Sequence, residues 1–202
     1  MLENVTGFLS SRKGKDFATA ALHLANLGYW LDAFVLDACH FTPQSRPRVF
    51  VIATTPELKP EDEVTPGLLW ATEESSLLRP ESIIHFKRTL DLPTGWVNLP
   101  IPDPPKRTLA LSELLDVDDG QEWWEETETK RHYEMMSSLH RRKVDELLAS
   151  GKQWVGTIFR RNRHQQMRAE VRFDGLAGCL RTPRGGSAKQ IVIAVNSGKL
   201  RM

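Results

Sequence analysis

Hydrophobic periodicity divides the first 54 residues into one predicted helix and two predicted strands. FATAALHLANL, residues 17–27, places apolar side chains at helical spacing, and Gly28 follows as a C-terminal cap. YWLDAFVLDAC (29–39) alternates loosely and RVFVIAT (48–54) is a short apolar run, as in buried strands. Helices between buried strands are typical of crossover units in an α/β sheet. With a strand end at the start of the chain, about three strands are present, fewer than a doubly wound domain has, so we predict a partial doubly wound, Rossmann-like sheet.

Prolines interrupt every regular pattern between Pro56 and Pro105, which predicts irregular chain there. Beyond it, the periodicity predicts two helices, two exposed strands and one buried strand: 109–117 and 128–151, 153–161 and 167–174, and 191–195. We therefore expect two domains of mixed α/β class. A sheet domain over 1–58 is followed by an irregular α+β domain over 59–202.

Charge is distributed unevenly, although the 202 residues have a formal net charge of only +1. Residues 111–130 hold eight acidic side chains and one basic one, whereas residues 151–202 hold eleven basic side chains and two acidic ones. A basic C-terminal quarter indicates a polyanionic partner such as nucleic acid.

The cysteine content and the hydropathy favour a cytoplasmic protein. Cys39 and Cys179 form neither a disulfide framework nor a C-x-x-C metal site, so we expect small buried thiols in a reducing compartment and no metal. No apolar run reaches the length of a membrane span, and the N-terminus does not have the pattern of a signal peptide.

Four groups of residues have the composition of functional sites, and each has an ordinary structural explanation as well. Glu3-Asn4-Val5 stands at a strand end, where ligand groups gather in α/β sheets, although a lone Glu is more often solvated. Gln44, Arg46 and Arg48 recur at every second position, so a strand would present them on one face, unless they only solvate its start. Two basic segments could contact phosphates and base edges, or be plain solvated turns: Arg160, Arg161, Arg163 and Arg168 near His164; and Arg181, Thr182, Arg184, Gly185, Gly186 and Gln190.

In this order, the segments resemble a known family. Residues 3–53 contain E-N-V, a helix followed by L-G-Y, and P-Q-x-R-x-R-V-F, and they closely resemble the middle of DNA (cytosine-5)-methyltransferases. EVRFDGLAGCLRTPRGGSAKQ, near the end of the chain, resembles the end of a target-recognition domain in one bacterial subgroup. The resemblance implies a prokaryotic modification enzyme of the restriction-modification type. Its substrate would be double-stranded DNA and its methyl donor S-adenosylmethionine.

The resemblance also implies residue roles. Glu3 would hydrogen-bond N3 and N4 of a flipped cytosine and Arg48 would contact O2, which draws electrons from the ring as a thiolate adds to C6. To donate to N3, Glu3 must be protonated, so we expect it to be buried. As supporting residues, Asn4 would shape the loop around the thiol, and Gln44 and Arg46 would hold the motif or contact phosphate. Base edges would be contacted by Arg181, Arg184 and Gln190, and phosphates by Arg160, Arg161 and Arg163.

Two family motifs are absent from these 202 residues: the F-x-G-x-G cofactor loop and the Pro-Cys dipeptide of the nucleophile. We therefore expect this polypeptide alone to be inactive, whether as a gene fragment, a degenerate copy or one chain of a split enzyme whose partner carries both motifs. The other interpretation is a non-catalytic DNA-recognition or assembly subunit. A basic α/β protein of unrelated function is a third.

Overall fold

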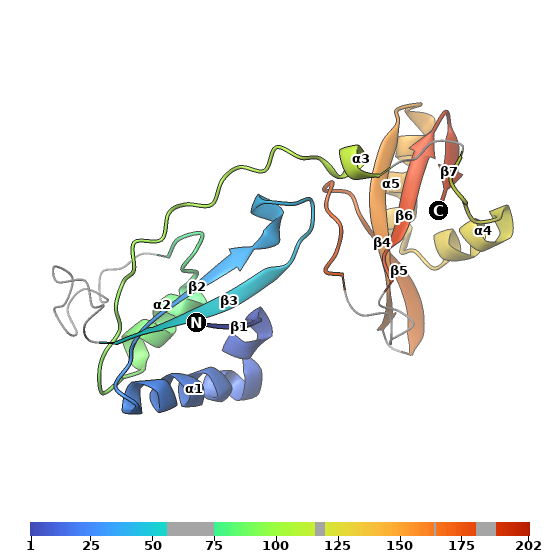
Figure 1. Cartoon of the computed structure of the whole chain (residues 1–202). Helices are drawn as coiled ribbons and strands as arrows, with labels where there is room; N and C mark the ends of the chain where they lie inside the picture. The colour runs from blue at the N-terminus through green and yellow to red at the C-terminus, as the bar shows by residue number, and fades with distance from the viewer. Residues whose placement is uncertain (56–74, 116–119, 164, 181–188) are drawn as a thin grey trace. The chain divides into compact units, whose positions relative to one another are not determined.

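The computed structural model describes residues 1–55, 75–115, 120–163, 165–180 and 189–202 (Figure 1). The chain forms two compact units. Unit 1 comprises Met1–Asp37 and Pro47–Pro104, and unit 2 comprises Ala38–Arg46 and Pro105–Met202. The backbone therefore passes between the units three times, after residues 37, 46 and 104.

Unit 1 contains a three-stranded sheet with the order β1-β3-β2. Its elements are β1 (Leu2–Val5), the 3-10 turns η1 (Thr6–Leu9) and η2 (Ser11–Gly14), α1 (Lys15–Asn26), β2 (Trp30–Asp37), β3 (Pro47–Thr54) and α2 (Glu81–Thr89). The predicted helix and strands of the first 54 residues are confirmed. Strand β3 is antiparallel to both neighbours, so β1 and β2 run in the same direction and α1 forms the crossover between them.

One face of this sheet forms the core of unit 1. Leu31, Ala33, Val49 and Val51 of β2 and β3 are buried in one cluster with α1 residues such as Phe17. Helix α1 packs there because its apolar positions recur at helical spacing, and Gly28, with a φ of 92°, ends it as predicted.

Residues 75–104 also belong to unit 1, and a buried carboxylate holds them there. Asp32 in β2 has no exposed side-chain surface, and its Oδ atoms lie 2.5 Å from Nη2 of Arg79 and 2.8 Å from Nζ of Lys87. The backbone N–H of Leu99 donates to the same carboxylate at 3.0 Å. The expectation of irregular chain between 56 and 105 was wrong for α2, which forms a helix within it. The first compact unit extends to Pro104, whereas the sequence predicts a sheet domain over 1–58.

Unit 2 contains a four-stranded antiparallel sheet with the order β5-β4-β6-β7. Its elements are η3 (Ala38–His40), α3 (Leu111–Leu114), α4 (Glu126–Glu134), α5 (Ser138–Ala149), β4 (Trp154–Arg163), β5 (Gln166–Arg172), β6 (Ile191–Asn196) and β7 (Lys199–Arg201). Val144 of α5 packs with Ile158 and Ile193 of the sheet in the core of the unit. With unit 1, this makes the chain a mixed α/β protein with two antiparallel sheets.

Three sequence-based predictions for unit 2 need correction. The single helix predicted over 128–151 is two helices, because the Ser137 hydroxyl accepts a hydrogen bond from the His140 N–H at 3.2 Å and caps a new helix. Strand β4 is buried from Val155 to Ile158 rather than exposed, since helices cover that part of the sheet. Strand β7 was not predicted, because three residues are too short for an alternating pattern.

Candidate functional site

A carboxylate and a guanidinium meet across the first two strands of the unit 1 sheet. In the register of β1 and β3, Glu3 lies opposite Phe50 and Val5 lies opposite Arg48, so Glu3 and Arg48 share one face as diagonal neighbours. Oε1 of Glu3 lies 2.8 Å from Nε of Arg48. Two residues far apart in the sequence are thus brought into one polar site.

The two side chains differ in burial. The Arg48 side chain is 15% exposed and the Glu3 side chain 49% exposed, and Nη1 of Arg48 donates to the Pro47 carbonyl at 2.8 Å. The guanidinium is therefore held from two sides. The expected burial of Glu3 was wrong, because β1 is an edge strand whose residues are all exposed.

Asn4 lies on the opposite face of β1 and is also exposed. Its Oδ1 accepts a hydrogen bond from the Val5 N–H at 2.8 Å, which fixes the backbone just before η1 begins. The supporting role predicted for Asn4 stays a prediction.

Gln44 and Arg46 do not continue the face of Arg48. Strand β3 begins at Pro47, and the chain before it pairs with residue 177: Ser45 N–H donates to the Ala177 carbonyl at 2.9 Å, and Ala177 N–H donates to the Pro43 carbonyl at 2.8 Å. Both side chains consequently belong to unit 2. The expected alternation was wrong because β3 begins only at Pro47 and the residues before it pair with Ala177 instead.

Arg46 instead contacts the second cysteine. Its Nη1 lies 3.2 Å from Sγ of Cys179 and 3.5 Å from the Leu180 carbonyl oxygen. Cys39 and Cys179 are both free thiols of intermediate exposure, so the expectation that they are fully buried was wrong. In the described part of the chain, no group of three or more His, Cys, Asp or Glu side chains is placed to hold a metal ion.

The β4–β5 hairpin carries the predicted basic cluster. Arg161 and Arg163 share one carboxylate, that of Glu170, with Nε–Oε distances of 3.9 and 2.7 Å. Arg168 lies directly opposite Arg161 across the two strands. Like charges in this position repel, so an anion bound along the hairpin would relieve the repulsion.

Most of the second predicted basic segment, namely Arg181, Thr182, Arg184, Gly185 and Gly186, lies outside the described residues, as does His164. Gln190 is described, and its Oε1 accepts a hydrogen bond from the Gly178 N–H at 3.2 Å. A side chain on Gly178 would come within 2.9 Å of that oxygen, so glycine permits this approach.

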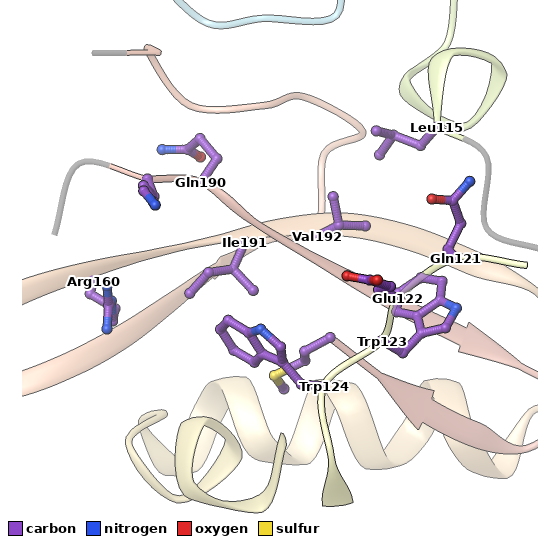
Figure 2. Close-up of a pocket in the computed structure, with 11 residues that line it drawn as sticks. Leu115, Gln121, Glu122, Trp123, Trp124, Arg160, Gln190, Ile191 and Val192 are labelled. Carbon is purple, nitrogen blue, oxygen red and sulfur yellow. The ribbon is translucent and has the colours of Figure 1, made fainter. Parts of the chain in front are cut away.

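Unit 2 also contains a pocket that the sequence analysis did not predict (Figure 2). Trp123 and Trp124 line it together with Arg160 and Gln190 and the apolar side chains of Ile191, Val192, Leu115 and Met202. Two adjacent tryptophans within the acidic segment were the available signal. Their partners come from remote parts of the chain, so spacing alone does not reveal the pocket.

The described residues include no helix with the length and apolarity needed to cross a membrane. A comparison with curated protein sequences gives no significant match. A comparison with family models matches residues 1–182 to the C-5 cytosine-specific DNA methylase model. The match covers most of the chain and includes the E-N-V and R-x-R segments; the chain therefore belongs to the C-5 cytosine-specific DNA methylase family, a family of methyltransferases that act on DNA.

Proposed function

We propose that this chain provides the pyrimidine-binding half of a DNA (cytosine-5)-methyltransferase site, with Glu3 and Arg48 as its catalytic residues. The supporting observation is the 2.8 Å contact between Glu3 and Arg48 across β1 and β3. A protonated carboxyl can donate to N3 of cytosine and accept from N4, while a guanidinium donates to O2. In the absence of a base, the two groups pair with each other, and a flipped cytosine would replace that contact.

Electron withdrawal is what these two groups would contribute. C6 of cytosine is a poor electrophile, and hydrogen bonds to N3 and O2 stabilise the negative charge that develops when a nucleophile adds there. Arg48 is largely buried and bonded to the Pro47 carbonyl, so its donors are positioned before the base arrives. Such preorganisation makes electrostatic stabilisation effective.

Unit 1 would be the C-terminal part of a doubly wound methyltransferase domain. The β1–α1–β2 crossover supports this assignment. S-adenosylmethionine supplies the methyl group in the family reaction, but the sequence contains neither F-x-G-x-G nor Pro-Cys. We propose that the cofactor site and the nucleophilic thiol lie outside these 202 residues, on a second polypeptide or in a longer protein.

Unit 2 would serve as the target-recognition domain on duplex DNA. The repulsion between Arg161 and Arg168 favours a phosphate-binding role for the hairpin. The same observation also supports a second function, a non-catalytic DNA-recognition subunit. A neighbouring reading frame that encodes F-x-G-x-G and Pro-Cys would favour the split enzyme over this alternative.

The purified 202-residue polypeptide is expected to transfer no methyl groups by itself, because a thiol must be placed beside C6 and neither cysteine stands in a Pro-Cys motif. Tritium transfer from S-adenosylmethionine to mixed-sequence duplex measures this directly. Mixing with a polypeptide that carries both motifs should restore transfer. Turnover by the chain alone would contradict the proposal, whereas duplex binding without restored turnover would favour the recognition subunit.

Substitution in the two basic segments should separate phosphate contacts from base contacts. Arg161→Ala is expected to weaken binding to all duplexes alike and to lower the salt slope by roughly one unit, because one phosphate contact is lost. Arg184→Ala should cost about 1–3 kcal/mol at one base pair and relax the preference there. Anisotropy titrations at several salt concentrations measure both effects, with Arg142→Ala on the exposed face of α5 as the control. A uniform loss for both variants would refute base contact by Arg184.

A further inference from the structure

The pocket at Trp123 and Trp124 is a second candidate ligand site, separate in the chain from Glu3 and Arg48. Its volume is about 320 Å³, at the lower end of the range for small-molecule pockets and suited to one planar ring system. Figure 2 shows the two indoles with Ile191 close by, and Met202 also lines the pocket. An aromatic ring entering this pocket would be surrounded mainly by apolar and aromatic surface.

Both tryptophans are held in place before any ligand binds. The backbone N–H of Trp124 donates to the Met202 carbonyl at 2.8 Å. The centroid of the Trp124 ring lies 4.6 Å from the ring centroid of His132, which is fully buried. The Arg201 guanidinium lies 5.9 Å from the centroid of the Trp123 ring. Stacking on rings that are already fixed requires little ordering of the protein, which favours binding.

The polar lining suits the edge of a heterocyclic base and a neighbouring phosphate. The lining provides amide and carboxylate groups from Gln121, Gln190 and Glu122. The Oε1 atom of Gln190 accepts a hydrogen bond from the Gly178 N–H. The Gln190 amide nitrogen is therefore the end of the side chain that would donate to a ligand. Arg160 and Lys189 are the cations of the lining and Glu122 its acid. The excess of positive charge is complementary to a phosphate.

Arg160 is the β4 cation that lines this pocket, whereas its neighbour Arg161 projects from the opposite face of the strand. A DNA phosphate held by Arg160 would bring its own nucleotide to the pocket. We propose that the Trp123–Trp124 pocket binds one unstacked nucleobase of the DNA, in addition to the cytosine bound at Glu3 and Arg48. This inference rests on the proposed function, since it requires that unit 2 contacts DNA.

The test compares two labelled duplexes that differ in one bulged thymine, titrated with the 202-residue chain and followed by fluorescence anisotropy. A bulged base is already unstacked, so the wild-type chain should bind that duplex more tightly. Trp124→Ala should remove this preference and weaken binding to the bulged duplex roughly 5- to 150-fold, the range expected for loss of one base–aromatic stack. Binding to the fully paired duplex should stay within about twofold.

Three further variants make the outcome decisive. Trp124→Phe keeps an aromatic ring and should retain most of the preference, which separates stacking from damage to the fold. Leu139→Ala removes an exposed apolar side chain of α5, and Glu81→Gln removes an exposed carboxylate of α2; both should leave the preference intact. Equal affinity of the wild-type chain for the two duplexes, or equal loss in Leu139→Ala, overturns the inference and leaves the proposed function standing. Failure to bind any duplex overturns both.

Discussion

Glu3→Gln is expected to lower the rate of methyl transfer by roughly 10²–10⁴-fold, the usual contribution of a positioned acid or base. The amide preserves the shape of the side chain but cannot act as an acid toward N3 of cytosine. Duplex affinity should be almost unchanged, because glutamine can still accept a hydrogen bond from N4 and phosphate contacts supply much of the affinity for DNA. The rate is measured in the enzyme that also holds the cofactor loop and the thiol.

The control for this experiment is Glu81→Gln, which removes an exposed carboxylate of α2 whose partner Arg88 lies at 3.5 Å. It should leave the rate within about twofold of wild type, since exposed ion pairs contribute little. Arg48→Lys tests the other half of the pair, because a lysine retains the charge but loses the planar donor fork. If Glu3→Gln transfers methyl groups as fast as Glu81→Gln, the catalytic assignment of Glu3 is wrong.

Asp32→Asn is expected to destabilise unit 1 by about 3–5 kcal/mol, the usual cost of breaking a buried ion pair. The side chains of Asp32 and Lys87 have no exposed surface, and Arg79 is 11% exposed on its side chain. The amide can still accept from the Leu99 N–H, but it leaves two cations without their shared counter-charge. The chain between 75 and 104 should then detach from β2.

Hydrogen exchange measured by peptide locates this effect. Peptides from β2 and α2 should lose protection in Asp32→Asn, while peptides from β4 and β6 in unit 2 should keep it. Glu81→Gln again serves as the matched control and should change stability by about 1 kcal/mol or less. Adding Lys87→Met to Asp32→Asn should recover part of the loss, because it removes one of the buried cations that lay beside the lost carboxylate. Unchanged protection of β2 in Asp32→Asn would show that the contacts of Asp32 with Arg79 and Lys87 do not hold residues 75–104 against β2.

The sequence was informative where structure depends on neighbouring residues. Helix α1 and strands β2 and β3 were predicted because period and capping are local signals, as Gly28 illustrates. Helix α2 was missed because prolines surround it and because its attachment depends on Asp32, about fifty residues earlier in the chain. Local pattern carries no information about such a contact.

For the candidate site, as for the fold, only part of the geometry could be predicted from the sequence. The family motif singled out Glu3 and Arg48, and the structure places them in contact. Strand alternation implied a common face for Gln44, Arg46 and Arg48, which fails because residues 43–45 pair with Ala177. The tryptophan pocket depends on the packing of residues 121–124 against the end of the chain near Met202, a tertiary arrangement that no spacing rule encodes.

The passage of the chain between the two units has a consequence for engineering new target specificity. Exchange of recognition domains between relatives is usually planned as the replacement of one continuous segment, but unit 2 contains Ala38–Arg46 as well as Pro105–Met202. A graft that began at residue 105 would leave Pro43 and Ser45 of the recipient to pair with a foreign residue in place of Ala177. The recognition role proposed for unit 2 would therefore depend on two segments of the chain, and chimaeras should carry the β2–β3 connection of the donor together with its residues from 105 onward.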